Sequence, residues 1–208
     1  NNKWFGTRGR GAARLDSCGE WTLFTTEEDW LGSDQIEGID FDLRGHGWFG
    51  TWGNGAFEYI PASSTSGAVL PASGGEVTSP DGSAKASFPP GAVDQPTIVT
   101  YNKASASPTG DLFGVRFFDL SAVISGTTTP VTNFNKPYTT TIYYTDREKG
   151  GAIENTLGLY WWDGGQWMLE SSSSVDTANN RLTAHPDHMT FFAVMGETKR
   201  VYLPLVLR

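Results

Sequence analysis

Apolar and polar residues alternate with a period of two along most of the chain, which is the pattern of half-buried β-strands. The clearest example lies in residues 157–195, where Leu157, Leu159 and Trp161 occupy alternate positions of one predicted strand. The Asp-Gly-Gly sequence at 163–165 follows, and these residues tolerate the positive φ values of a tight hairpin turn. No segment keeps a helical period over a useful length. We therefore predict consecutive strands joined by tight turns.

Further strands are predicted where β-branched and aromatic residues gather between turn residues. They span residues 20–24, 36–42, 68–70, 76–79, 83–88, 97–102, 112–123, 138–145, 166–169, 181–184 and 190–195, with 68–70 as a short edge strand. One short helical turn is predicted within 146–155. The number and spacing of the strands predict an all-β fold.

The second half of the chain carries a set of short segments that are typical of one kind of module. They are Gly-Gly-Glu-Val at 74–77, Asp-Gly-Ser at 81–83, Phe-Pro-Pro-Gly-Ala-Val at 88–93, Leu-Tyr-Trp-Trp-Asp-Gly at 159–164, Trp167, Val-Asp at 175–176 and His-Met-Thr-Phe-Phe-Ala-Val at 188–194. Together they make residues 67–196 resemble the ZU5-like β-sandwich modules of bacterial surface proteins. The resemblance implies a β-sandwich over 68–196.

The first sixty residues contain an internal repeat. Trp-Phe-Gly-Thr at 4–7 recurs at 48–51, and Gly-Ala at 11–12 recurs at 55–56, so the offset is 44 residues (48 − 4). A period in the forties with several short strands per unit is typical of β-propeller blades. Asp-Leu-Arg-Gly at 42–45, followed by Trp-Phe-Gly-Thr, resembles the propeller repeats of bacterial two-component regulators. The resemblance implies partial propeller-repeat antiparallel sheets over residues 1–60.

Fewer than two repeat units are present, whereas a closed propeller needs at least about four blades. A single unit cannot bury its apolar face alone, so we expect open sheet edges. A longer precursor, the second domain or neighbouring subunits would complete them. We expect Trp4 and Phe5 to lie at such an interface, and Trp4 and Trp48 to be packing positions because they are equivalent in the repeat.

Two segments flank the predicted sandwich. Residues 61–67 are small and polar and are predicted to be a linker, and residues 197–208 are predicted to be an extended C-terminal strand. This tail is suited to strand exchange with a neighbouring copy through Val201, Tyr202, Leu203, Leu205 and Leu207. The alternatives are that it folds back onto its own domain or serves in export or surface attachment.

Composition narrows the function classes. The 208 residues are 38% hydrophobic, 13% aromatic and only 18% charged, and the net charge is −8. This acidic balance opposes binding to nucleic acid or to an anionic membrane. No apolar run approaches the ~20 residues of a membrane span. No signal peptide is present and the chain starts at Asn1 without Met, so we expect a processed, secreted form, with Cys18 either buried or paired between chains.

Candidate chemistry is sparse. His188 and Thr190 form a His-x-Thr sequence similar to that of self-cleaving relatives, in which the hydroxyl would attack the preceding carbonyl and the imidazole would act as base. His185 and His188, with Asp187, are a poor metal template, so no metal or other cofactor is expected. An alternative function is glycan binding, in which Trp48, Trp52 and Trp162 would be exposed and stack on sugar rings.

The absence of a strong catalytic signature favours a structural function. We expect a non-catalytic extracellular protein of the cell surface that assembles with other copies of itself, through open β-edges and strand exchange, into a filament or layer. A carbohydrate-binding adhesive module and a self-cleaving ZU5-like domain are the alternatives.

Overall fold

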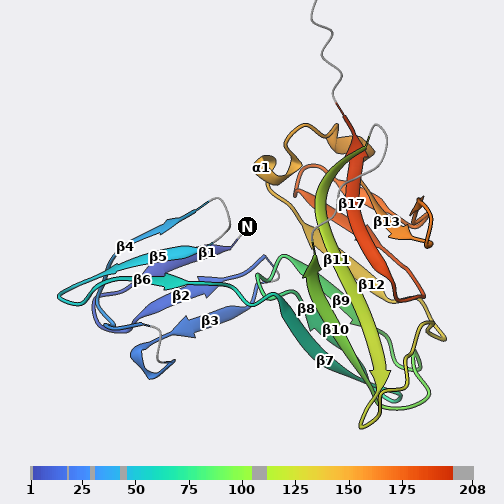
Figure 1. The fold of residues 1–208 in the computed structure, drawn as a ribbon, viewed down its shortest axis with the longest axis horizontal. Helices are drawn as coiled ribbons and strands as arrows, with labels where there is room; N and C mark the ends of the chain where they lie inside the picture. The colour runs from blue at the N-terminus through green and yellow to red at the C-terminus, as the bar shows by residue number, and fades with distance from the viewer. Residues whose placement is uncertain (1, 18, 29–30, 43–45, 105–111, 199–208) are drawn as a thin grey trace, which may run out of the picture.

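The computed structural model describes residues 2–17, 19–28, 31–42, 46–104 and 112–198 (Figure 1). The described chain is all-β, with antiparallel strand pairing throughout, as the sequence predicts. The strands are β1 (Lys3–Gly6), β2 (Ala12–Leu15), β3 (Trp21–Phe24), β4 (Ile36–Phe41), β5 (Gly47–Thr51), β6 (Gly55–Tyr59), β7 (Ser64–Leu70), β8 (Gly74–Thr78), β9 (Ala84–Phe88), β10 (Thr97–Ala104), β11 (Leu112–Ile124), β12 (Thr139–Tyr143), β13 (Gly158–Trp162), β14 (Trp167–Leu169), β15 (Ser174–Asp176), β16 (Arg181–Ala184) and β17 (Phe191–Glu197). The helical segments are η1 (Thr26–Glu28), α1 (Asp146–Lys149) and η2 (Glu154–Thr156).

The N-terminal region forms two three-stranded sheets. Sheet 1 has the order β1-β2-β3, and sheet 2 has the order β4-β5-β6. They share one apolar core, in which the Trp4 ring lies 5.0 Å from Phe24, 5.3 Å from Phe49 and 5.3 Å from Tyr59 between ring centroids. Each sheet thus buries one face against the other, and we call the two together the sheet pair.

All later strands belong to one eleven-stranded sheet of order β14-β13-β17-β11-β10-β7-β8-β9-β12-β16-β15. This sheet curls into a half-barrel beside the sheet pair (Figure 1). Its concave side encloses the larger core, in which aromatic rings such as Phe118, Phe192 and Tyr138 are almost fully buried. The hairpins predicted within 157–195 and the helical turn predicted within 146–155 are both confirmed.

The sequence boundary between the two parts needs correction. Strand β7 begins at Ser64, so the linker predicted over 61–67 is too long. The strand lies between β10 and β8 rather than at an edge. The physical reason is pairing with β10, where Thr65 stands opposite Tyr101 and the Ser66 hydroxyl lies 2.9 Å from that of Thr100. Small polar residues that look like a linker are therefore held in a ladder.

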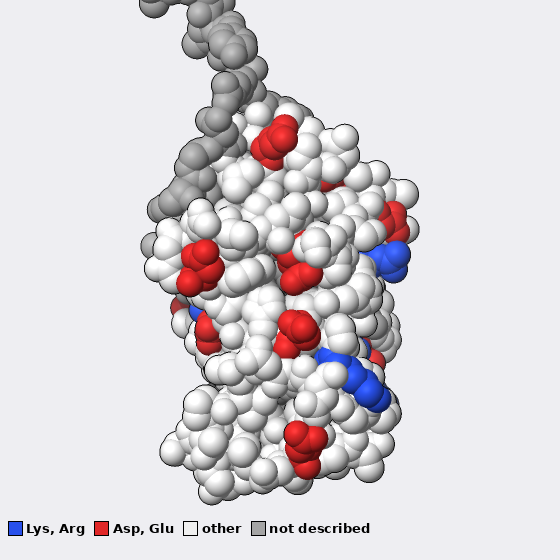
Figure 2. Space-filling model, turned by 90° about the vertical axis from the view of Figure 1, so that its right-hand side faces the viewer, with Lys and Arg blue, Asp and Glu red and all other residues white. Residues whose placement is uncertain are grey.

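Both ends of the half-barrel sheet are short. The edge strands β14 and β15 have three residues each, which limits the backbone available for pairing with another chain. The outer side of the half-barrel carries acidic side chains scattered among uncharged ones, with a few Lys and Arg (Figure 2). Among the described residues no helix has the length and apolarity to cross a bilayer. The half-barrel therefore offers neither a long free edge nor a surface of one charge sign on the side shown.

Candidate functional site

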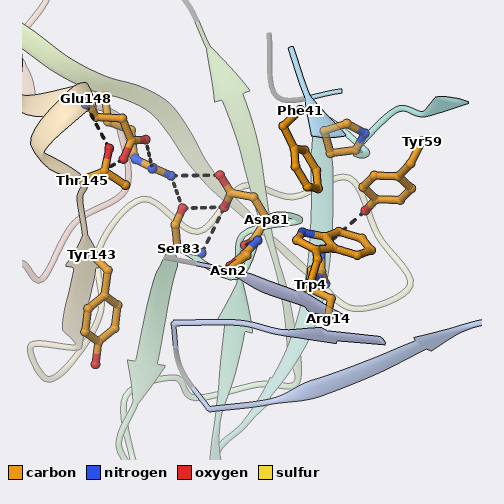
Figure 3. A pocket seen from close by; sticks show the side chains of 12 residues that line it. Asn2, Trp4, Arg14, Phe41, Tyr59, Asp81, Ser83, Tyr143, Thr145 and Glu148 are labelled. Atoms are coloured by element: carbon orange, nitrogen blue, oxygen red, sulfur yellow. Dashed lines mark hydrogen bonds and ion pairs between the residues drawn. The ribbon is translucent and has the colours of Figure 1, made fainter. Parts of the chain in front are cut away.

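A cavity of about 380 Å³ lies where the sheet pair meets the half-barrel, and we call it the cleft (Figure 3). Trp4, Phe41 and Tyr59 of the sheet pair form an aromatic wall. Charged and hydroxyl-bearing side chains of the half-barrel face them. The other lining residues are Asn2, Arg14, Pro61, Asp81, Ser83, Arg116, Tyr143, Thr145 and Glu148.

Arg116 is the centre of the polar wall. It follows an irregularity in the pairing of β11 with β17, between Gly114 and Arg116, and such bulges redirect side chains. One guanidinium nitrogen donates to Asp81 Oδ2 at 3.2 Å and also to the Ser83 hydroxyl, and the other donates to Glu148 Oε1 at 2.7 Å. Only 11% of the Arg116 side chain is exposed. Two carboxylates thus compensate one buried cation.

Each carboxylate also organises its own local segment. Glu148 completes a capping box at the start of α1, with the Thr145 backbone N–H donating to Glu148 Oε2 at 2.9 Å. Asp81 sits in the turn between β8 and β9, where Oδ1 accepts from the Ser79 hydroxyl at 2.6 Å and from the Ser83 backbone N–H at 3.0 Å. The cleft wall is therefore fixed by the folding of two turns.

The ion pairs decide the protonation state of this wall. Burial alone would raise the pKa of Asp81, but the Arg116 guanidinium and hydrogen bonds from Ser79 and Ser83 outweigh it and hold the pKa well below its usual range. Burial opposes the charge on Arg116, whereas Asp81 and Glu148 raise its pKa. Burial also raises the pKa of Tyr101 to about 12. The carboxylate of Asp81 and the guanidinium are both charged at neutral pH.

The sheet pair holds the Asp81 turn from the other side. Arg14 Nη1 donates to the Pro80 carbonyl at 2.8 Å, and the Asn2 amide donates to the Asp81 carbonyl. The Arg14 guanidinium lies 5.9 Å from the centre of the Trp4 ring, within cation–π range. Asn2 Oδ1 and Arg14 Nε are buried and have no hydrogen-bond partner among the described residues. Asn2 and Arg14 thus join the aromatic wall to the turn that carries Asp81.

The tryptophans expected to bind glycans do not form one site. Trp48 is 45% exposed on the outer face of sheet 2, and Trp52 is 68% exposed in the turn between β5 and β6. Trp162 lies on β13 of the half-barrel, where its ring packs on Trp167 with centroids 5.3 Å apart. The tryptophan that lines the cleft is Trp4, which the sequence predicts to be a packing and interface position rather than a ligand-binding one.

The two repeat tryptophans also differ in burial. Trp4 packs in the shared core, whereas Trp48 points outward, so the expectation that both are packing positions is wrong for Trp48 within this chain. The neighbouring phenylalanines are reversed, because Phe5 is 45% exposed and Phe49 is fully buried. At each pair of equivalent positions in the repeat, one side chain is therefore buried and the other is exposed.

The His188–Thr190 segment is held as ordered structure between strands. The Thr190 hydroxyl donates to the Trp162 carbonyl at 3.0 Å, and His188 Nδ1 lies 3.3 Å from the Asp187 carboxylate. The His188 ring contacts Trp161 edge-on, with centroids 4.9 Å apart. Within the described ranges, no group of three or more His, Cys, Asp or Glu residues is arranged to hold a metal ion.

The strand-exchange residues Val201, Tyr202, Leu203, Leu205 and Leu207, and also Cys18, lie outside the described residues. No protein-family model matches the chain, and no curated protein matches it in sequence.

Proposed function

We propose that the chain is a non-catalytic structural module of an extracellular assembly, and that it associates with another β-sheet through the outer face of sheet 1. The observation that carries this proposal is the exposure of large apolar side chains there. Trp21 is 62% exposed, Leu23 is 55% exposed and Phe5 is 45% exposed. Residues of this type and exposure, side by side on one sheet, are typical of interaction surfaces.

The register of sheet 1 makes these side chains contiguous. Phe5 stands opposite Ala13, and Ala13 stands opposite Leu23. Leu15 stands opposite Trp21, and the rings of Phe5 and Trp21 lie 5.5 Å apart between centroids. The face is therefore a continuous apolar strip across all three strands.

The outer strand of sheet 1 adds a second means of association. Within the described residues, β3 pairs only with β2, and β6 of sheet 2 pairs only with β5. An unpaired strand edge offers backbone donors and acceptors to a further strand. Strand β3 has four residues and β6 has five, against three in each edge strand of the half-barrel. Association is thus favoured at the sheet pair.

The biological setting of this proposal rests on the sequence. The extracellular location, the ZU5-like sandwich and the propeller-type repeat are all proposals that follow from resemblance. The cell-surface filament or layer belongs to the same proposal. The tail beyond Thr198 remains a second proposed route to it, through strand exchange.

Sedimentation velocity at increasing protein concentration tests the proposal. The intact chain is expected to sediment faster as its concentration rises, because apolar faces associate by mass action. The double variant Trp21→Ser/Leu23→Ser is expected to remain monomeric. Trp52→Ser removes an equally exposed tryptophan outside the strip and should behave as the intact chain does. An intact chain that stays monomeric at every concentration would contradict the proposal.

A second candidate function is binding of a neutral, hydroxyl-rich ligand such as a sugar in the cleft. The observation that favours it is the aromatic wall of the cleft facing a few fixed polar side chains, since ligand sites combine apolar walls with a few placed polar groups. Calorimetric titration with neutral oligosaccharides tests it. Binding that Asn2→Ala weakens, while Trp162→Ala leaves it unchanged, supports the cleft, and the reverse result supports the half-barrel tryptophan.

A further inference from the structure

The sequence repeat is also a structural repeat. In the turn between β1 and β2, the Thr7 hydroxyl donates to the Gly11 carbonyl at 2.8 Å. In the turn between β5 and β6, the Thr51 hydroxyl donates to the Gly55 carbonyl at 2.9 Å. Gly11 and Gly55 both have positive φ, at 71° and 85°. The β1–β2 and β5–β6 hairpins are therefore built alike, and equivalent side chains leave equivalent faces of each sheet.

Each repeat thus has two distinguishable faces. We call the face that carries the tryptophan the Trp face; it holds Trp4, Ala12 and Arg14 in sheet 1 and Trp48, Ala56 and Glu58 in sheet 2. We call the opposite face the Phe face; it holds Phe5, Ala13 and Leu15 in sheet 1 and Phe49, Phe57 and Tyr59 in sheet 2.

The contact inside the sheet pair joins unlike faces. The Trp face of sheet 1 packs on the Phe face of sheet 2, as shown by the 5.3 Å separation of the Trp4 and Phe49 rings. Ala12 is fully buried there, whereas its equivalent Ala56 is exposed. This is a head-to-tail contact, and no described residue covers the Phe face of sheet 1 or the Trp face of sheet 2, where Phe5 and Trp48 are each 45% exposed. These are one Phe face and one Trp face, the same combination that packs together inside the sheet pair.

From this we infer that the partner of the sheet 1 strip is the Trp face of sheet 2 in a second copy of the chain. The inference rests on the proposed function and specifies its partner. In such a contact Trp48 would lie against Phe5 of the next copy in the way that Trp4 lies against Phe49 within the chain. The internal contact supplies the geometric template, so no new kind of surface is required.

Charge complementarity favours a second copy as the occupant. On the Trp face, Glu58 of sheet 2 stands where sheet 1 has Arg14, and Asp40 stands opposite Trp48. Inside the sheet pair, Arg14 Nη1 lies 3.4 Å from the Tyr59 hydroxyl. In the proposed contact, the equivalent residues are Glu58 of one copy and Leu15 of the next, so these two would lie close together. Lys3 stands directly opposite Leu15 on the Phe face. The template thus brings an acidic Trp face to a Phe face that carries a lysine.

Two unlike faces give a defined kind of assembly. A head-to-tail contact generates a ring if its rotation closes and an open helical filament if it does not. In Figure 1 the half-barrel lies to one side of the sheet pair and extends above and below it, so stacked copies would have to be rotated about the stacking direction to keep their half-barrels apart. We therefore expect oligomers larger than a dimer, with the half-barrels arranged around a central column of sheet pairs.

A complementation experiment tests this inference. One variant, Trp21→Ser/Leu23→Ser, keeps the Trp face of sheet 2, and a second variant, Trp48→Ser, keeps the strip on sheet 1. Each alone is expected to be monomeric in sedimentation velocity, and an equimolar mixture of the two is expected to form a dimer and nothing larger. Circular dichroism of each variant checks that it is folded, and Trp52→Ser is the control that should still form the larger oligomers.

The outcomes separate the inference from the proposal on which it rests. If the intact chain associates but Trp48→Ser associates equally well, the strip binds itself or another surface, and the head-to-tail inference is overturned while the proposed function stands. If the intact chain never associates, both are overturned. In support of the charge argument, Glu58→Lys should weaken association about ten-fold, and combining it with Lys3→Glu should restore it.

Discussion

The Asp81 carboxylate offers the sharpest test of the site, because several parts of the fold depend on it. It accepts from Ser79 and Ser83 in its own turn and pairs with Arg116 at 3.2 Å. We predict that Asp81→Asn lowers the free energy of unfolding at pH 7. An asparagine oxygen preserves a hydrogen-bond acceptor for the serines, whereas the charge opposite Arg116 is lost.

The size of the expected loss depends on how far the Asp81 side chain is exposed to solvent. Removing one partner of a fully buried ion pair costs about 3–5 kcal/mol. The Asp81 side chain is 36% exposed, and Glu148 still pairs with Arg116 at 2.7 Å, so solvent and the second carboxylate compensate part of the loss. We therefore expect a loss of about 1–2 kcal/mol, measured by urea denaturation followed by circular dichroism. Asp94→Asn removes one charge from an exposed position and should change the free energy by less than about 0.5 kcal/mol.

The pH dependence of the free energy of unfolding is a stronger test of the Asp81–Arg116 ion pair. The folded-state pKa of Asp81 lies well below the unfolded value of about 3.9, so the unfolded chain takes up the proton first as pH falls. The stabilisation is complete above that unfolded pKa and is lost progressively as pH falls below about 4. The difference between the intact chain and Asp81→Asn should therefore shrink between pH 7 and about pH 2.5. A difference that stays constant over this range would refute the ion-pair explanation.

Two further predictions concern the half-barrel. Gly67→Ala should destabilise the fold by about 3 kcal/mol in the same urea assay, because the added methyl would overlap the Glu76 carbonyl oxygen, whereas Gly38→Ala, where no atom lies within 4 Å, should cost far less. Mass spectrometry of the denatured chain should show one uncut species, because the Thr190 hydroxyl donates to the Trp162 carbonyl; a cut after residue 189 would establish self-cleavage instead.

Strand positions were predictable because their signals are local. The alternation that begins at Leu157 and the Asp-Gly-Gly turn at 163–165 specify a hairpin, and β13 pairs with β14 in that way. The helical turn at α1 was also predictable, although its capping pair, Thr145 and Glu148, was not singled out. Such features require only neighbouring residues, so a single sequence is sufficient to find them.

The cleft was not predictable, because its parts are distant in the sequence. Arg116 is 35 residues from Asp81 and 32 residues from Glu148. Trp4 reaches the site only because sheet 1 lies against the turn between β8 and β9. The one local signal was the Asp-Gly-Ser turn at 81–83, and it marks a turn without indicating a charged partner. Locating such a network requires the order of all eleven strands of the half-barrel.

The repeat is the sequence feature from which we propose a contact between chains. Strands that alternate apolar and polar residues have one covered face, but Trp-Phe at 4–5 and 48–49 places large apolar side chains on both faces of the strand. In the structure each pair has one member in the shared core and one member 45% exposed, and the exposed member is Phe5 in one repeat and Trp48 in the other. Two surface positions taken at random would not both be expected to carry large apolar side chains, as Phe5 and Trp48 do. The repeat therefore places large apolar side chains on both faces of each sheet, whereas the described residues cover only one face of each. In the assembly that we propose, a second copy would cover the other face.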